Sequence, residues 1–190
     1  MVRNTLLSIS LLSCLILWLG GDAAARARTE TLAELSARAQ GAGIVRCVEA
    51  ASSRSGPRGM IFTMYRFERL AGVAGAVPES FTLRVAGGTA DGYRVTIPHA
   101  PRFEAGRSYL LFLKPATSGG ALLVAGAARG VLPARAGVAG GWEVAVPDRL
   151  APGAAAKSPA SPADLAEGRR WMNLEAVKAL LAGPAEGGRQ

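Results

Sequence analysis

Cysteine and histidine are scarce in this chain of 190 residues, and this scarcity excludes several kinds of site. The chain has two cysteines, Cys14 and Cys47, and a single histidine, His99. Zinc sites need three or four histidine, cysteine or carboxylate ligands at suitable spacing, so the usual zinc sites cannot form. Cys14 falls in a predicted export signal, which leaves one cysteine in the mature chain and excludes an intramolecular disulfide. We expect Cys47, inside the apolar run IVRCV, to be a buried small hydrophobe.

Motifs of nucleotide binding and of nucleophilic catalysis are also missing. The segment AGGTADG, residues 86–92, is neither a Walker A nor a dinucleotide pattern, and it does not open a helix. The Asp-Gly pair within it predicts a turn instead. No nucleophile elbow of the G-x-S-x-G kind occurs. A hydrolase would therefore need an unorthodox site, for which His99, Asp91 and Ser108 are the available residues.

Acidic side chains form no obvious pair or cluster along the chain. Glycoside hydrolysis needs two carboxylates across a cleft, and Glu104, Glu143 and Asp148 are candidates only because they are acids. Asp91 is the only acid in GGTADGY, so a calcium site at this segment would lack further carboxylate ligands. The sequence therefore predicts no catalytic residue, no cofactor and no metal.

Residues 1–27 have the pattern of an export signal. Arg3 supplies the positive start, an apolar stretch covers residues 6–19, and AAARA at 23–27 offers small residues for cleavage. A membrane span needs about 20 apolar residues, whereas this stretch is shorter and interrupted by serines. LLSC resembles a lipidation signal ending at Cys14, but the apolar run continues past that cysteine. We expect cleavage and an exported protein, periplasmic or secreted, without a transmembrane segment afterwards.

The charge is positive but scattered. The formal net charge of +8 becomes +7 once Arg3, Arg26 and Asp22 leave with the signal. The longest run of basic residues is only the pair Arg169-Arg170. Nucleic-acid sites need a clustered basic stripe with stacking aromatics, so we expect no nucleic-acid partner. Weak attraction to anionic polymers of the cell surface stays an alternative.

A short helix is predicted at each end of the mature chain. In segment 28–41, Thr31 can cap a helix, a glutamate three residues later completes a capping box, and Gly41 suits the stop. In segment 171–184, Asn173 can cap a second helix whose apolar residues share one face.

Short β-like runs fill the space between the two helices. Alternation and β-branched or aromatic residues predict strands at 43–52, 60–70, 80–85, 93–97, 107–114, 121–128 and 141–146. Tyr109 to Leu113 are all apolar, so this strand must be central, or a helix or loop must cover its outer face. The pattern predicts a mainly β fold, a small antiparallel barrel or sandwich.

The composition changes after residue 146. Proline, alanine and serine dominate up to residue 164, which predicts an extended, flexible linker. The chain is thus divided into a signal peptide, a β-barrel domain with its N-terminal helix, a linker and a C-terminal helix, at 1–27, 28–146, 147–170 and 171–184.

The most patterned stretch is APRFEAGRSYLLFLKP, residues 100–115. Pro101 stiffens its entry, Phe103 is expected to plug one end of the barrel, and Gly106 permits a tight turn. Aromatic residues lie mainly in the predicted strands and are expected to form the core. A groove for a ligand or peptide would use one or two of them at the barrel mouth.

Two resemblances follow from these strands. Residues 77–115, with a Gly-Gly turn, a Pro-x-Phe and an apolar YLLFL strand, resemble a pattern in exported bacterial proteins of unknown function. The arrangement of a helix with a five-strand barrel is similar to the OB-like barrel of netrin and tissue metalloproteinase-inhibitor modules. Those inhibitors meet the protease zinc through an N-terminal cysteine, which is absent near Arg26 or Arg28. The resemblance implies a fold and supplies no functional residue.

Taken together, these features predict an exported, non-enzymatic, OB-like module that binds a protein or a cell-envelope component. Two alternatives stay open. One is an exported hydrolase that uses His99, Asp91 or Ser108, and the other is electrostatic attachment to anionic surface polymers.

Overall fold

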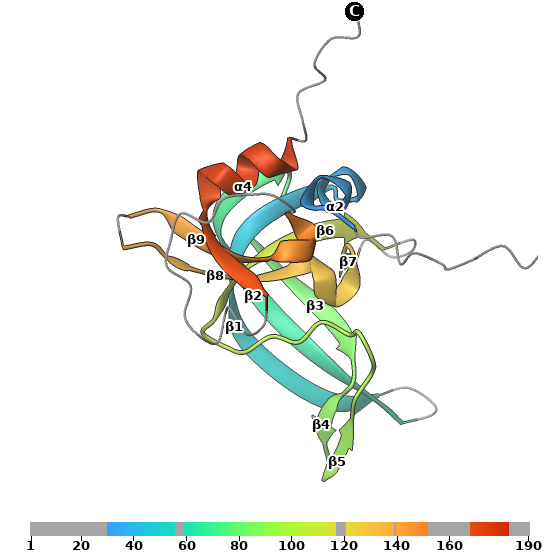
Figure 1. Ribbon diagram of the computed structural model, residues 1–190. Coiled ribbons are helices and arrows are strands. Elements are labelled where there is room, and N and C mark those ends of the chain that lie inside the picture. The colour runs from blue at the N-terminus through green and yellow to red at the C-terminus, as the bar shows by residue number, and fades with distance from the viewer. Residues whose placement is uncertain (1–29, 56–58, 117–120, 139, 152–167, 183–190) are drawn as a thin grey trace, which may run out of the picture.

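Eight antiparallel strands form the main sheet of the protein. We describe a computed structural model over residues 30–55, 59–116, 121–138, 140–151 and 168–182. In this part of the chain the sheet order is β10-β9-β8-β6-β1-β2-β3, with β7 paired to β6, while β4 and β5 form a separate two-stranded ribbon (Figure 1). The strands are β1 (Gly41–Ser55), β2 (Met60–Gly75), β3 (Ser80–Ala86), β4 (Gly88–Ala90), β5 (Tyr93–Val95), β6 (Ser108–Pro115), β7 (Leu122–Val124), β8 (Val131–Ala136), β9 (Trp142–Pro147) and β10 (Arg169–Asn173). The mainly β, antiparallel prediction is confirmed.

Helix α2 (Leu32–Arg38) begins as predicted and ends earlier than predicted. The Thr31 hydroxyl accepts from the backbone N–H of Glu34, whose carboxylate accepts from the N–H of Thr31, so the capping box is confirmed. Residue 39 is already extended, and the Gln40 N–H donates to Leu113 O at 2.7 Å. Gly41 therefore does not stop the helix. It opens β1, where an added Cβ would lie 2.3 Å from the Ala76 carbonyl oxygen.

Ordered structure continues past the predicted domain boundary at residue 146. Asp148–Leu150 form a 3-10 turn, and β10 pairs with β9 over Arg169–Asn173. The linker predicted over 147–170 and the helix predicted from 171 were therefore wrong at these positions, and residues 152–167 lie outside the described part. Helix α4 (Leu174–Leu181) begins after Asn173, whose side chain accepts from the Ala176 N–H as expected.

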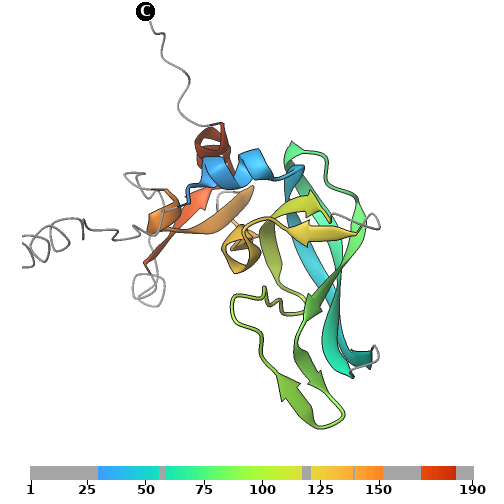
Figure 2. The same cartoon turned by 90° about the vertical axis from the view of Figure 1, so that its right-hand side faces the viewer.

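One hydrophobic core lies between the two helices and the sheet. Leu35 of α2 and Val177 of α4 belong to one buried cluster with Ile44 of β1 and Phe112 of β6. The helices contact each other at one end of the molecule, opposite the β4–β5 ribbon, as the two views agree (Figures 1 and 2). They cover the outer face of β1 and β6, which explains why β6 is apolar on both faces.

A second core lies on the opposite face of the same strands. Cys47 of β1 and Leu111 of β6 are fully buried there, beside Phe67 and Phe81. Phe103 belongs to this core and is 6% exposed. The expectation that Tyr109 to Leu113 form a strand buried on both faces is confirmed.

Three strand predictions need correction. The strand predicted over 121–128 ends early, because β7 covers only Leu122–Val124 and Ala127–Gly130 form a 3-10 turn. Segment 93–97 does not join the sheet: its first three residues form the exposed strand β5, and Tyr93 is 61% exposed. Strand β8 lies outside the strands predicted from alternation, and it contains Pro133, which lacks the N–H that a ladder uses. Pro133 lies opposite Tyr109 of β6. Pairing of β8 with β9 starts only at Ala134, so the ladder between β8 and β9 needs no N–H donor from residue 133.

The sheet curves so that β3 comes into contact with β7. Within the described residues no ladder joins these two strands, and β3 and β10 remain the two ends of the sheet. Neither described helix is long and apolar enough to cross a bilayer. The signal predicted over 1–27 lies outside the described residues.

Candidate functional site

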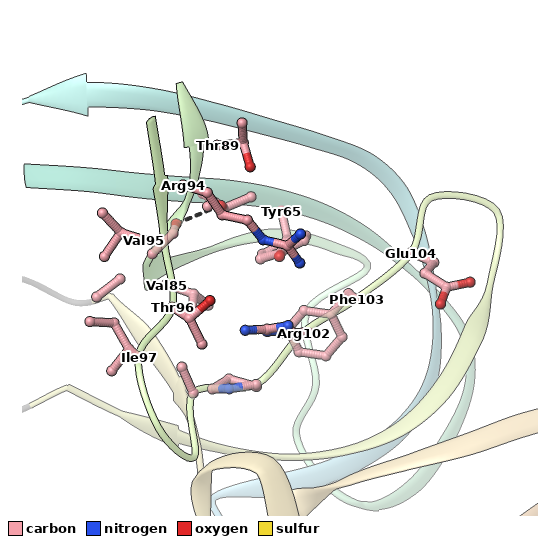
Figure 3. A pocket seen from close by; sticks show the side chains of 16 residues that line it. Tyr65, Val85, Thr89, Arg94, Val95, Thr96, Ile97, Arg102, Phe103 and Glu104 are labelled. Carbon is pink, nitrogen blue, oxygen red and sulfur yellow. Dashed lines mark hydrogen bonds between the residues drawn. The ribbon is translucent and has the colours of Figure 1, made fainter. Parts of the chain in front are cut away.

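A cavity of about 290 Å³ lies where the β4–β5 ribbon leaves the main sheet. Its walls are the ends of β2 and β3, the ribbon, and the loop of residues 96–104 that returns to β6 (Figure 3). We call this cavity the ribbon groove. Ligand pockets for small molecules commonly measure about 300–1,000 Å³, so the groove suits one side chain or chain end.

Hydroxyl groups and two glycines fix the upper wall of the ribbon groove. The buried Thr63 hydroxyl donates to the Gly87 carbonyl oxygen at 2.8 Å and lies 2.8 Å from the Ser52 hydroxyl. Gly88 has φ 131°, and a Cβ there would lie 2.3 Å from the Thr63 Oγ1. Only glycine allows the ribbon backbone to pass this close to β1 and β2.

Aromatic rings form the floor of the ribbon groove. The Phe103 ring packs edge-on against Tyr65 at 4.9 Å, Phe67 at 4.9 Å and Tyr109 at 5.4 Å between ring centroids. The Glu104 N–H donates to the Tyr109 hydroxyl at 2.9 Å, which fixes the loop to β6. The floor is therefore rigid and continuous with the second core.

The ribbon that borders the groove is held by Arg54 of β1. The Arg54 guanidinium lies 4.7 Å from the centroid of the Tyr93 ring, and its Nε lies 3.9 Å from a carboxylate oxygen of Asp91. Asp91 has φ 53° and Gly92 has φ 77°, as the two-residue Asp-Gly turn requires. The ribbon thus has a defined position although it lies outside the main sheet.

Apolar side chains remain exposed along the ribbon and the start of the loop. Tyr93, Val95 and Ile97 are 61%, 39% and 41% exposed. A single exposed apolar residue needs no explanation, whereas neighbours beside a cavity are typical of a binding surface. Val95 and Ile97 line the ribbon groove and supply its apolar rim, and Tyr93 lies further along the ribbon against Arg54.

Two arginines extend into the ribbon groove. Arg94 comes from β5 and Arg102 from the loop, and both side chains point into the space above Tyr65 and Phe103 (Figure 3). Within the described part of the chain, neither guanidinium forms an ion pair or a side-chain hydrogen bond. The one acid that lines the groove, Glu104, lies 3.0 Å from the Arg107 Nε. The groove therefore carries positive charge that no described side chain neutralises.

The three residues available for a hydrolase do not come together. Asp91 lies at the tip of the ribbon beside Arg54, and Ser108 pairs with Arg46 at the start of β6. His99 lies in the loop at φ 59°, and its carbonyl oxygen accepts from the Ala128 N–H. No hydrogen bond between any two of the three is found among the residues that the structure describes.

Each acid considered for a carboxylate pair is bound to an arginine instead. Glu104 contacts Arg107, Glu143 accepts from the Arg135 Nε at 2.9 Å, and Asp148 accepts from the Arg170 Nε at 2.6 Å. Across the described ranges, no group of three or more histidine, cysteine or acidic residues is placed to hold a metal.

Cys47 is fully buried, as the sequence predicts. Desolvation raises the pKa of its thiol, partly offset by a contact of 3.5 Å from the sulfur to the Glu49 carbonyl oxygen. Burial likewise raises the pKa of the Tyr109 hydroxyl. A thiol that stays protonated is a poor nucleophile, so Cys47 acts as core.

Sequence reasoning missed Arg94 and Arg102. They are two among many scattered arginines, and their chain neighbours do not distinguish them. The sequence does carry a signal for the groove wall. The Gly87-Gly88 pair predicts a close approach of the backbone, and the Asp-Gly turn after it predicts a hairpin. The groove floor does contain core aromatics, Tyr65 and Phe103.

Comparisons of the chain with protein families, with curated proteins and with solved structures find no match.

Proposed function

We propose that this chain is an exported, non-enzymatic module that binds a protein or a cell-envelope component through the ribbon groove. The observation that carries the proposal is the groove itself, with its aromatic floor, its apolar rim and two arginines without partners among the described residues. Exposed apolar groups and unneutralised charge on a rigid frame favour binding, because little conformational entropy is lost.

We infer an OB-like barrel, because β1 pairs with both β2 and β6 and because β3 returns to contact β7. OB folds bind ligands on their strands and connecting loops, which supports the position of the groove. The pattern of residues 1–27 supports export.

The distribution of charge favours this function over the two alternatives. The separation of His99, Asp91 and Ser108 supports a non-enzymatic role. Attachment to a polymer needs many free cations along one face, whereas most described arginines contact an acid, among them Arg46 with Glu68.

A site-specific cross-linking experiment tests the proposal. A photoreactive amino acid replaces Ile97 on the groove rim, and in a matched control it replaces the exposed Val138 in the β8–β9 turn. The full chain is expressed in the cells that produce it, and the cross-linked products and their cell fraction are identified. We expect one product specific to position 97, outside the cytoplasm, that disappears when Thr96→Trp fills the groove.

Three results would count against the proposed function. The first is the same set of products from both positions. The second is a product at position 97 that survives Thr96→Trp in a protein of unchanged melting temperature. The third is retention of the full chain in the cytoplasm, which would remove the exported part of the proposal.

A further inference from the structure

The strongest unexplained feature of the molecule is the pair of free guanidinium groups in the ribbon groove. Arg54 and Arg107 flank the groove as well, but Asp91 and Glu104 neutralise them. Arg94 and Arg102 have no such acid among the described residues, and both point into the same cavity (Figure 3). Two guanidinium groups that line one cavity with an apolar floor favour an anion, because each can donate several N–H groups in a fixed plane.

We infer that the ribbon groove binds a carboxylate carried by an extended, acidic segment of a partner protein, with Arg94 and Arg102 as the donors. This inference rests on the proposed function and specifies the chemistry of its ligand.

The isolation of the two arginines favours a single compact anion. A third exposed arginine near the groove, Arg84 of β3, already has partners. Its guanidinium lies 3.7 Å from the Phe62 ring centroid and donates a hydrogen bond to the Ser55 hydroxyl. A polyanion would gain its affinity from a series of free cations. The described surface provides a pair inside one cavity, which matches one carboxylate group.

The edge of β3 provides a place for an extended segment. The Gly87 N–H donates to Ile61 O and the Arg69 N–H donates to Glu79 O, so odd-numbered residues of β3 bond to β2. Hydrogen-bonding directions alternate along a strand, so the backbone N–H and C=O of Arg84 and Ala86 point away from β2. Both residues are exposed at the end of the sheet, and Ala86 lines the groove.

An added strand on this edge would lie beside both the groove and its rim. A segment that pairs with β3 gains backbone hydrogen bonds and presents alternate side chains to neighbouring pockets. One acidic side chain can enter the groove, and its apolar neighbours can contact Val95 and Ile97. The same carboxylate chemistry would also accept a free chain end, so the test includes both sources.

The test is a titration followed by NMR of the full mature chain. The probes are the peptide acetyl-Ala-Val-Glu-Val-Ala-amide, its Gln counterpart, acetyl-Ala-Val-Ala-Val with a free carboxylate, and inorganic polyphosphate. The variants are Arg94→Gln, Arg102→Gln and, as a control, Arg149→Gln, which removes an exposed charge in the 3-10 turn after β9. Unchanged amide spectra outside the groove establish that each variant is folded.

We expect the Glu peptide to shift the resonances of residues 84–87 and 94–97 with saturation in the millimolar range. The Gln peptide and each groove variant should weaken this binding by about tenfold or more, as loss of a charge-assisted hydrogen bond does. Arg149→Gln should bind like the parent. If the peptide with a free C-terminal carboxylate binds more strongly than the Glu peptide, the inference is supported and the bound carboxylate comes from a chain end of the partner.

Three outcomes would overturn the inference. The first is that the Glu peptide binds no better than the Gln peptide, whether both bind equally or neither carboxylate probe gives a saturable shift. The second is an equal loss of binding in Arg149→Gln. The third is displacement of the peptide by polyphosphate at a lower concentration. The proposed function is tested separately. If position 97 still captures a partner in the double Arg94→Gln and Arg102→Gln variant, the proposed function stands and the inference of a bound carboxylate is wrong.

Discussion

Replacing Phe103 with alanine should lower the free energy of unfolding by about 4 kcal/mol, because removal of a buried phenylalanine usually costs 3–5 kcal/mol. Phe103 is 6% exposed and its ring packs edge-on against three other rings, so the truncation leaves a cavity bounded by rigid groups. Each aromatic pair contributes about 0.5–1.5 kcal/mol beyond its buried area, so we expect a loss above the lower end of the 3–5 kcal/mol range.

Equilibrium unfolding in urea is the assay, with the slope of the transition compared between variants. The matched control is Phe62→Ala, because Phe62 is partly exposed and lies under the Arg84 guanidinium instead of in the core. We expect that control to lose less than half as much. A loss below about 1 kcal/mol for Phe103→Ala at an unchanged slope, or a loss equal to the control, would refute the assignment of Phe103 to the core.

Three further predictions follow from the same structure. Leu111→Ala should destabilise the fold by about 2–5 kcal/mol in the same assay, and a value near zero would show that the second core does not include β6. Gly88→Ala should detach the ribbon from the sheet, because the new Cβ would meet the Thr63 hydroxyl. We expect faster amide hydrogen exchange in β4 and β5 while the main sheet stays protected, and unchanged exchange would contradict the prediction. Stability should fall as the pH rises above 9.0, the ordinary pKa of a thiol, because the unfolded chain releases the Cys47 proton before the folded one does. Cys47→Ala should flatten this fall without abolishing it, since the raised pKa of Tyr109 acts in the same direction, and an identical pH profile in the variant would contradict the prediction.

Local patterns explain which parts of the fold could be predicted. The alternation of Phe81 and Leu83 with Thr82 and Arg84 identifies β3, and the structure buries the first pair and exposes the second. Helix caps are equally local, so Thr31 could be recognised without any tertiary information. Such features depend only on the spacing of neighbouring residues.

Long-range pairing explains which parts could not be predicted. Strand β10 begins with Arg169-Arg170, which suggests a solvated segment, and it becomes a strand only because β9 offers an edge and Asp148 offers a carboxylate. The charge of the groove is also a tertiary property. Among the described residues, the fold brings Asp91 near Arg54 and no acid near Arg94. No sequence window contains that information.

The position of the two helices has a consequence for the order of folding. Leu35 and Val177 lie near opposite ends of the described chain and share one core. That core stays incomplete until β10 and α4 are available, because they supply Met172, Leu174 and Val177. A fold with such distant contacts forms slowly, typically in milliseconds to seconds for mainly β domains. Commitment to the native state therefore waits for β10 and α4.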